Sequence, residues 1–385
     1  MGETIVDTRV AEILDREVDR QSSTIELIAS ENFASKSVMD LCGSVFTNKY
    51  AEGYPGKRYY NGCQHMDEIE DLAINELTKL YDCKFANVQP HSGVNANTAV
   101  YQAFMKPGQV LMGMDLASGG HLSHGATPTL SGKVYNSVTY GVDKDGYLDY
   151  HYIGGQAKLW CPKVIVAGAS AYPRQIDWKA FREIADSVGA ILVVDMAHYS
   201  GLIAGQAYDS PLPYADVVTS TTHKTLRGPR GGMILWNNPN YTKRINSSIF
   251  PGTQGGPLMN IIAAKAQCYI EANTDEFKQY SKQVVKNAQA MALSLKQYGM
   301  KVLTEGTDSH IILLDLSDFK YSGREAADLL EANGITVNKN GVPNDPRNFI
   351  ETSGIRIGTA AETTRGQQEY WFRELAQKIV NILKN

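Results

Sequence analysis

Short apolar runs alternate with amphipathic stretches along most of the chain. Runs such as AILVVDMAH are apolar on both faces, which is typical of strands buried inside a parallel sheet. The predicted strands are 85–90, 109–114, 133–142, 163–170, 190–198, 215–222 and 232–236. Amphipathic stretches predict helices at 66–81, 91–105 and 178–189. The pattern indicates an α/β fold whose mostly parallel sheet, flanked by helices, gathers functional residues at the carboxyl ends of its strands.

The pattern changes after residue 258, where helical periodicity continues to residue 298 without a strand signal. Beyond it, strands are predicted at 300–304, 309–316 and 356–361, and helices at 322–334 and 366–384. This order predicts a smaller α+β domain at the C-terminus. We therefore expect three parts, which are an N-terminal arm with a helix (1–30), a large domain (31–275) and a small domain (276–385).

Composition and charge exclude several classes of partner. The 385 residues carry a formal net charge of -4, and no block of like charges indicates a nucleic-acid or membrane partner. The five cysteines are odd in number and include no C-x-x-C pair, so neither a disulfide framework nor a zinc site is predicted. The N-terminus shows no signal-peptide core, and no apolar run approaches membrane-spanning length. We therefore expect a cytoplasmic protein.

A loop rich in tyrosine precedes the alternating region. The stretch TNKYAEGYPGKRYYNG holds Tyr50, Tyr54, Tyr59 and Tyr60 among glycines and charged residues. It has neither helical nor strand periodicity, and exposed aromatic loops of this kind tend to be contact surfaces. The alternative is a loop that packs against its own core.

Two turns at predicted strand ends carry candidate cofactor ligands. QPHSGVNANTA follows a strand and opens a helix, so the small residues Ser92 and Gly93 leave backbone N–H groups free to bind phosphate. An ordinary helix start is the alternative. Asp195 ends the buried run VVDMAH, and His198 follows three residues later. A buried carboxylate is costly without a cationic partner such as a pyridinium nitrogen, although Asp195 could instead cap the next turn.

Two basic residues suggest the rest of an amino-acid site. Lys224 lies in STTHKTLRGPRGG, just after another predicted strand. A lysine among small residues can have a lowered pKa and form a Schiff base, and the threonine hydroxyls beside it could hold a phosphate or orient the amine. Arg356 lies in SGIRIGT and could bind a carboxylate in a bidentate manner. Considered singly, a lysine in a surface turn and an arginine at a solvated sheet edge are the more common situations.

Together, a phosphate cradle, a strand-end aspartate, a strand-end lysine and a carboxylate-binding arginine are the parts that pyridoxal 5′-phosphate (PLP) chemistry on an amino acid requires. Their order, and blocks along almost the whole chain, resemble the serine hydroxymethyltransferase family. The blocks are ELIASEN, NKYAEGYPGKRYY, NVQPHSG, GGHLSHG, GASAYPR, VVDMAH, TTHKTLRGPRGG, FPGTQGGP, TVNKN and SGIRIGT. The resemblance implies the PLP-dependent transferase fold type I, the fold of aspartate aminotransferase, with a seven-stranded sheet in the large domain.

The resemblance implies a role in PLP binding for each matching position. Lys224 would bind PLP as an aldimine, Asp195 would pair with the pyridine nitrogen, and His121 would stack on the ring. The remaining contacts would come from Ser92, Gly93, Ser170 and His198, and across a subunit boundary from Tyr50, Gly255 and Gly256. His223 would lie beside the aldimine as a catalytic residue. No metal site is implied, because the H-x-x-H pair of His121 and His124 lacks an evident third ligand.

The implied substrates are L-serine or glycine and, as cosubstrate, tetrahydrofolate. Arg356 would bind the substrate carboxylate with help from Ser30, and Glu52 would relay a proton to or from the serine hydroxyl. Tyr50, Tyr59 and Tyr60 would line the site, with Tyr60 as a further catalytic and substrate-binding residue. Because Tyr50, Glu52 and Tyr60 would come from the partner chain, an obligate homodimer with shared active sites is implied, and a tetramer is left open. The folate-binding positions would be Leu116, Gly120, Leu122, Asn340 and Tyr59.

The implied reaction is the reversible retro-aldol conversion of serine and tetrahydrofolate into glycine and 5,10-methylenetetrahydrofolate. The alternative on the same scaffold is a folate-independent aldolase or transaldolase that acts on another β-hydroxy or α-methyl amino acid. A catalytically silent binding protein is disfavoured, because Lys224, Asp195 and Arg356 are all present.

Three departures from the family pattern bear on these expectations. Ser118 stands where many members carry a second histidine, which bears on folate affinity. Val94 and Asn95 replace the usual residues beside the phosphate cradle and are expected to tune it slightly. The sequence stops at Asn385, earlier than family members usually do, which bears on the stability of the small domain.

Overall fold

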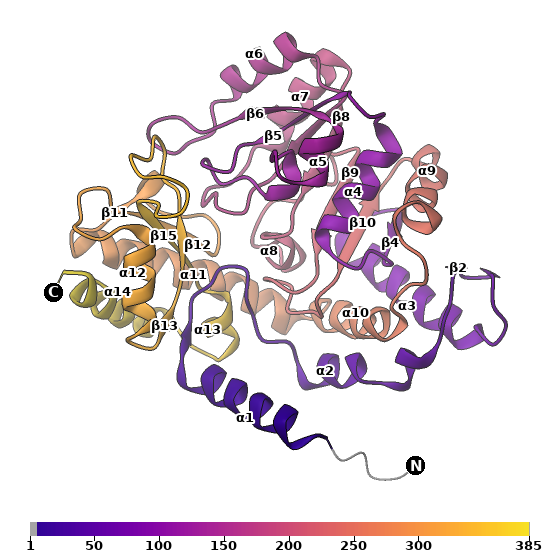
Figure 1. Ribbon diagram of the computed structural model, residues 1–385, viewed down its shortest axis with the longest axis horizontal. Coiled ribbons are helices and arrows are strands. Elements are labelled where there is room, and N and C mark those ends of the chain that lie inside the picture. The colour runs from indigo at the N-terminus through magenta and orange to yellow at the C-terminus, as the bar shows by residue number, and fades with distance from the viewer. Residues whose placement is uncertain (1–5, 385) are drawn as a thin grey trace.

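The structure, a computed structural model, describes residues 6–384, so residues 1–5 of the predicted arm and residue 385 lie outside the described range. Within that range, seven strands form a large sheet in the order β4-β10-β9-β8-β7-β5-β6 (Figure 1). Neighbouring strands are parallel except at β10, which runs antiparallel to both β9 and β4. The strands are β4 (Phe85–Asn87), β5 (Val110–Met114), β6 (Asn136–Tyr140), β7 (Val164–Ala167), β8 (Ile191–Asp195), β9 (Val217–Thr221) and β10 (Gly232–Trp236). The predicted mostly parallel α/β sheet is therefore confirmed.

Apolar side chains of the large sheet point alternately to two core clusters. Leu192 and Val194 of β8 belong to one cluster, whereas Val193 between them belongs to another that includes the inner face of α4. Helices cover both clusters and account for the strands being apolar on both faces. The helices are α2 (Lys36–Cys42), α3 (Gln64–Tyr81), α4 (Gly93–Phe104), α5 (Leu130–Val134), α6 (Tyr150–Trp160), α7 (Trp178–Val188), α8 (Ser200–Ala204), α9 (Thr242–Ser247) and α10 (Met259–Ala272), with short helical turns η1 (Val45–Asn48), η2 (Leu122–His124), η3 (Pro239–Tyr241) and η4 (Ser248–Thr253).

A second sheet and a separate apolar core lie in the C-terminal part of the chain (Figure 1). The sheet has the order β11-β12-β15-β14, and each neighbouring pair is antiparallel. Its elements are β11 (Lys301–Val302), η5 (Leu303–Glu305), β12 (Ile311–Asp315), β14 (Asn338–Asn340) and β15 (Gly354–Gly358), with helices α11 (Asp275–Gln297), α12 (Gly323–Glu331), α13 (Ala360–Thr364) and α14 (Glu369–Lys384). The α+β character expected here is present, and the division of the chain at residue 275 stays a prediction.

Three elements of this region differ from the sequence-based expectation. The predicted strand 356–361 is β15, which ends at Gly358, and residues 360 and 361 begin α13. The predicted helical region 258–298 is two helices, because the Thr274 hydroxyl accepts a hydrogen bond from the Phe277 N–H (3.2 Å) and begins a new helix. The predicted strand 300–304 is shortened to β11. Thr304 has a φ of 56°, a left-handed conformation that ends the strand in a turn.

The tyrosine-rich loop contains a small hairpin that its lack of periodicity did not predict. β2 (Gly53–Tyr54) and β3 (Lys57–Arg58) pair in antiparallel register. The Arg58 guanidinium lies beneath the hairpin, where it forms ion pairs with Asp67 (2.8 Å) and Glu70 (2.7 Å) of α3. The loop is therefore tied to α3 by buried charges rather than by an apolar pattern.

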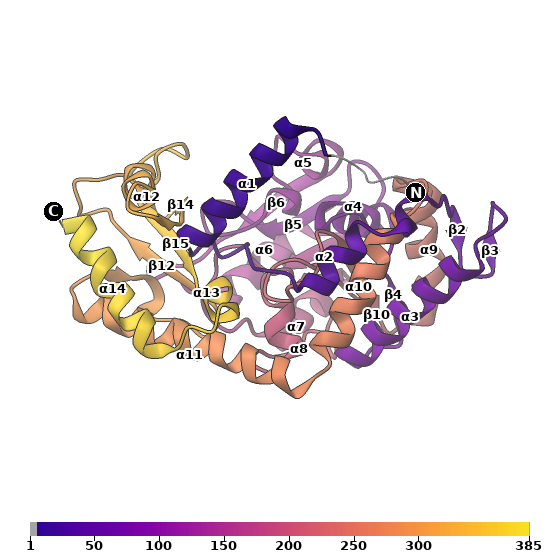
Figure 2. The same cartoon turned by 90° about the horizontal axis from the view of Figure 1, so that it is seen from below.

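The N-terminal arm pairs with the C-terminal part through a short strand, and the helix that precedes this strand is exposed. β1 (Ile25–Glu26) pairs in parallel with β13 (Ile335–Thr336). The helix α1 (Thr8–Ser23) has no buried residue and lies along the outside of the molecule (Figures 1 and 2). Its apolar side chains recur at helical spacing and are 56%, 60%, 59% and 57% exposed at Val10, Ile13, Leu14 and Val18. No helix of residues 6–384 is long and apolar enough to cross a membrane, and the expected cytoplasmic location stays a prediction.

Gly168 allows the loop after β7 to pass close to Asp195. Its φ is +119°, and a Cβ atom there would lie 2.1 Å from the Asp195 carbonyl oxygen. We therefore predict that Gly168→Ala lowers the free energy of unfolding by about 2–3 kcal/mol.

The matched control is Gly155→Ala in α6, where a Cβ would meet no atom within 4 Å. This substitution should raise the free energy of unfolding by about 0.5–1 kcal/mol. Urea unfolding followed by circular dichroism measures both variants, and equal stability of the two would contradict the predicted clash.

Candidate active site

A cavity of about 280 Å³ lies at the carboxyl edge of the large sheet. Its walls come from the N-terminal arm and from the segments that follow β4, β5, β7, β8 and β9. The lining residues are Ser30, Glu31, Ser92, Gly93, Val94, Asn97, His121, His124, Ala169, Ser170, Asp195, Ala197, His198, Thr221, His223, Lys224 and Arg230. The structure therefore brings Lys224, Asp195 and the predicted phosphate cradle into one space, as expected for residues at the ends of parallel strands.

Asp195 is a buried carboxylate that accepts three hydrogen bonds. Its Oδ2 accepts from Asn97 Nδ2 (2.9 Å) and His124 Nε2 (3.0 Å), and its Oδ1 accepts from the Ala197 N–H (3.1 Å). His124 Nδ1 accepts from the His121 N–H (3.3 Å), which leaves the ring proton on Nε2, where it points at Asp195. Burial alone would raise the pKa of Asp195, but the hydrogen bond from His124 and the neighbouring side chains hold it below its usual value. Asp195 is therefore ionised and available to a cationic ligand.

Lys224 is a buried amine whose charge is disfavoured. Burial lowers its pKa to about 8, a shift that Arg356 and Arg230 support and Asp195 opposes. Among the described residues, no hydrogen bond or ion pair from its Nζ is found. At pH 7 a larger fraction of this amine is neutral than in an ordinary lysine. The neutral form is the nucleophile.

The threonines beside Lys224 mainly build the turn that presents it. The Thr222 hydroxyl donates to the Pro229 carbonyl (2.6 Å), and the Thr225 hydroxyl donates to the His198 carbonyl (2.8 Å). The expectation that all these hydroxyls could bind a phosphate or orient the amine is therefore wrong for Thr222 and Thr225. Only the Thr221 Oγ1, which is buried without a partner, stays available.

The start of α4 has the features of an anion site. Ser92 is the N-cap residue, and its hydroxyl accepts from the Asn95 N–H (3.2 Å). A Cβ on Gly93 would lie 2.7 Å from Thr221 Cγ2, so only glycine lets the helix start this close to the end of β9. The His223 Nδ1, like the Thr221 hydroxyl, is buried and unpaired at this side of the cavity. Free helix N–H groups and two unsatisfied polar side chains fit the phosphate of PLP.

Four further histidines at or beside the site are held neutral. Burial lowers the pKa of His121 to about 4 and that of His223 to about 3. The ring of His198 stacks on that of His310, with ring centroids 5.6 Å apart and an interplanar angle of 15°. Burial lowers the pKa of His198 well below its usual value and that of His310 to about 3. None of these rings adds positive charge to the cavity at neutral pH.

Arg356 is a buried guanidinium without a carboxylate partner among the described residues. Its Nη1 donates to the Ser170 carbonyl (2.6 Å) and its Nε to Asn338 Oδ1 (2.9 Å). Burial lowers its pKa to about 10. Arg356 does not itself line the cavity, but Ser170 does, and the guanidinium is close enough to lower the pKa of Lys224. An unpaired buried cation of this kind fits a substrate carboxylate.

The predicted partner-chain residues form a separate exposed cluster. Tyr50 and Tyr60 meet edge to face with ring centroids 5.5 Å apart, and Glu52 lies beside Tyr60. A Cβ on Gly255 would lie 3.4 Å from Glu52 Oε1, and one on Gly256 would lie 2.9 Å from Tyr50 Cε1. None of these five residues lines the Lys224 cavity. Within one chain, the structure therefore does not bring this tyrosine cluster to the site.

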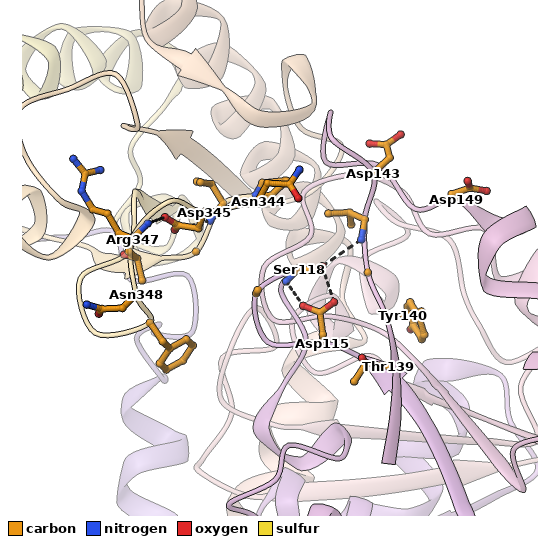
Figure 3. A pocket seen from close by; sticks show the side chains of 18 of the residues that line it. Asp115, Ser118, Thr139, Tyr140, Asp143, Asp149, Asn344, Asp345, Arg347 and Asn348 are labelled. Carbon is orange, nitrogen blue, oxygen red and sulfur yellow. Dashed lines mark hydrogen bonds between the residues drawn. The ribbon is translucent and has the colours of Figure 1, made fainter. Parts of the chain in front are cut away.

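A second, larger cavity of about 790 Å³ lies next to the loop after β5, which carries three of the predicted folate positions, but none of the five positions lines it (Figure 3). Figure 3 shows Asp115 and Ser118 on one wall and the segment from Asn344 to Asn348 on the other. The Ser118 hydroxyl donates to Asp115 Oδ2 (2.9 Å).

The five folate positions are spread over the loop after β5, the strand β14 and the tyrosine-rich loop. Leu116 and Gly120 belong to the loop after β5, in which Asp115 and Ser118 are hydrogen-bonded to each other. Leu122, at the end of this loop, is exposed. Asn340 lines a smaller pocket that shares Ser118 with the larger cavity. Tyr59 lies elsewhere, exposed beside Phe250.

Sequence reasoning missed four polar residues around the cavity. Asn97 bridges Asp195 and the Ser123 hydroxyl, and helical spacing from Gly93 is the signal that could have found it. His124 was considered only as a metal ligand, and no cluster that could hold a metal ion is found among residues 6–384. Lys265 and His310 gave no signal, because their partners are far away in the sequence.

Comparison with known proteins gives consistent matches. A sequence model of the family described as serine hydroxymethyltransferase matches residues 4–379. The chain is 56% identical over 379 residues to a serine hydroxymethyltransferase of Wolbachia sp. subsp. Drosophila simulans (strain wRi), covering 98% of this chain and 89% of that one. It is 55% identical to the serine hydroxymethyltransferase of Wolbachia pipientis wMel, again covering 98% of this chain and 89% of that one. It is 54% identical to that of a Nitratiruptor species, covering 98% and 91%.

The lowered pKa of Lys224 predicts its reactivity in the cofactor-free protein. A neutral amine reacts with formaldehyde and cyanoborohydride, so methylation of Lys224 should rise with pH and level off above about 8. Peptide mass spectrometry resolves this lysine from the others. Lys144, exposed beside Asp145 with a raised pKa, is the internal control and should still be gaining reactivity at pH 10. A Lys224 profile that follows that of Lys144 would contradict the assignment.

Proposed function

Because the chain belongs to the serine hydroxymethyltransferase family, we propose that it catalyses the reversible conversion of L-serine and tetrahydrofolate into glycine and 5,10-methylenetetrahydrofolate. Enzymes of this family use PLP as cofactor and tetrahydrofolate as cosubstrate. PLP, when bound, supplies an electron sink for the negative charge that develops on the amino-acid α-carbon. The observation that carries the proposal is an amine with a lowered pKa, Lys224, that shares one cavity with the ionised carboxylate of Asp195.

Side chains and helix amides of the cavity would hold the cofactor. Asp195 would accept a hydrogen bond from the pyridine nitrogen and keep that nitrogen protonated. The first N–H groups of α4 and the residues Ser92 and Gly93 would bind the phosphate at the positive end of the helix dipole. The neutral ring of His121 would lie against the pyridine ring. Ser170 and His198 would line the side that carries the phenolate oxygen.

Arg356 would orient the amino-acid substrate. Its guanidinium is buried without an ion-pair partner in the described part of the chain, which supports a bidentate contact to the substrate carboxylate. Ser30, which lines the cavity, would donate a further hydrogen bond to that carboxylate. Holding the substrate by its carboxylate would fix which bond to the α-carbon is broken.

Two residues would handle protons and covalent attachment. Lys224 would hold the cofactor covalently, since the neutral fraction of its amine is nucleophilic at neutral pH. Glu52 would take the proton of the serine hydroxyl as the Cα–Cβ bond breaks, with Tyr60 beside it. His223, which is neutral, would lie beside Lys224 without adding a positive charge that lowers the pKa of the amine further.

An obligate homodimer forms part of the proposal. Glu52 and Tyr60 belong to an exposed cluster outside the cavity of their own chain, so a second copy would have to bring them to it. Tyr50, Gly255 and Gly256 of the same cluster would reach the neighbouring phosphate. The exposed apolar stripe of α1 offers further surface that a second copy would cover.

Tetrahydrofolate would enter beside the loop after β5. Leu116, Gly120 and Leu122 would contact the pteridine ring from this loop, and Asn340 would approach it from β14. Tyr59 of the exposed tyrosine loop would complete the folate contacts at the shared site.

The first functional prediction concerns turnover. With PLP bound, the protein should convert serine to glycine. A visible absorbance band that depends on glycine should appear when tetrahydrofolate is added. Lys224→Ala should lower kcat by at least about a thousandfold while circular dichroism stays unchanged. Lys144→Ala, an exposed lysine, is the control and should keep full activity. Serine turnover at a rate indifferent to folate would instead support a folate-independent aldolase.

The second prediction tests the shared site. Lys224→Ala and Glu52→Gln chains should each be inactive as homodimers. Refolding the two together should restore about a quarter of wild-type activity, because half of the random dimers are mixed and each mixed dimer has one intact site. Mixed dimers confirmed by native mass spectrometry that stay inactive would contradict the contribution of Glu52 from the partner.

A further inference from the structure

Lys265 is a fully buried lysine of α10 that the reaction described so far does not use. Its side chain is 1% exposed. Its Nζ donates to the carbonyl oxygens of Val88 (2.6 Å), Gly232 (2.8 Å) and Pro90 (3.0 Å). These bonds use all three N–H groups of the ammonium, so Lys265 joins α10 to two other segments of the chain.

The three acceptors belong to segments that frame the start of α4. Val88 and Pro90 lie in the loop that leads from β4 to Ser92, and Gly232 begins β10. The Gly232 N–H donates to the Pro90 carbonyl (3.0 Å), so these segments are also bonded to each other. A Cβ on Gly232 would lie 2.3 Å from the Ser92 carbonyl oxygen. A shift of the backbone that Lys265 holds would therefore displace the residue that caps α4.

Two other side chains hold the rest of the same loop. Asn87 accepts from the Gln89 N–H at Oδ1 (2.9 Å). Gln254 donates from Nε2 to the Gln89 carbonyl (2.9 Å) and accepts from the His91 N–H at Oε1 (2.9 Å). Lys265, Gln254 and Asn87 together fix the backbone of residues 88–91. This loop carries no regular secondary structure, so side chains supply the rigidity that a strand or helix would otherwise give.

The ammonium has no carboxylate partner in contact among the described residues. The nearest interacting acid is Glu70, whose oxygens are engaged by Arg58 (2.7 Å) and Gln89 Nε2 (2.7 Å). Burial lowers the pKa of Lys265 to about 7, and Glu70 opposes that shift. The three carbonyl oxygens around Nζ favour the ammonium form, because only the protonated amine has three N–H groups to donate. A buried cation without an ion pair is costly, and this one lies directly behind the proposed phosphate site.

We propose that Lys265 is a positioning residue for the phosphate group of PLP. It acts through the backbone of the loop that leads into α4, whose N–H groups it keeps aimed at the phosphate. Its positive charge offsets the negative charge of the phosphate from behind this loop. The inference rests on the proposed function, because it takes the start of α4 as the phosphate site.

The test compares two non-covalent probes on the cofactor-free protein. Pyridoxine 5′-phosphate and pyridoxine differ only in the phosphate, and neither has an aldehyde that could react with Lys224. Calorimetry gives the affinity ratio of the two probes. Lys265→Met should reduce the ratio about tenfold or more, because it removes the charge and all three hydrogen bonds. Binding of pyridoxine itself should change little.

Two further variants separate positioning from stability. Ile262→Ala, one turn earlier on α10 and equally buried, should lower the thermal midpoint but keep the wild-type ratio. Lys265→Gln keeps a polar, shorter side chain and removes the charge, so it should fold even where Lys265→Met does not, and it should also reduce the ratio.

The outcomes distinguish this inference from the proposed function. A wild-type protein that binds both probes equally would refute the phosphate site itself. A wild-type preference for the phosphate probe that persists in Lys265→Met or Lys265→Gln would refute the role of Lys265 alone. An equal loss of affinity for both probes in these variants would also overturn it, since it would mark Lys265 as merely structural.

Discussion

Two neighbouring parallel strands set the position of the chemistry. β8 ends at Asp195, which lies in register with Thr219 of β9, and β9 ends two residues later, before the turn that carries Lys224. A carboxylate and an amine are thus presented at one edge of one sheet. Because burial penalises both charges, the surrounding residues are arranged to keep the carboxylate ionised and the amine partly neutral.

The polar groups around this pair are not equally satisfied. Asp195 accepts three hydrogen bonds, whereas the Thr221 hydroxyl and His223 Nδ1 are buried without partners and the Arg356 guanidinium has no carboxylate within the described range. Each unsatisfied buried group costs about 1–3 kcal/mol, and both Thr221 and His223 line the same cavity. A ligand that carries a phosphate and a carboxylate would satisfy them, which couples binding to stability.

The sheet and its strand-end residues could be predicted because both depend on local pattern. Asp195 and Lys224 each follow an apolar run that a buried strand explains. Asn97, His310 and Lys265 could not be found in this way, because what they do depends on groups across the fold. His310, for example, stacks on a histidine 112 residues away. Nor does periodicity reveal that the tyrosine cluster lies outside the cavity of its own chain, since that depends on how distant segments fold together.

The most direct test of the account is to reduce the PLP-loaded protein with borohydride and locate the modified lysine by peptide mass spectrometry. The account predicts that Lys224 alone carries the reduced cofactor. The nearby buried amine of Lys265 should stay unmodified, because its three hydrogen bonds hold it behind the loop. Modification of Lys265 or of a surface lysine in place of Lys224, or no modification at all, would contradict the account.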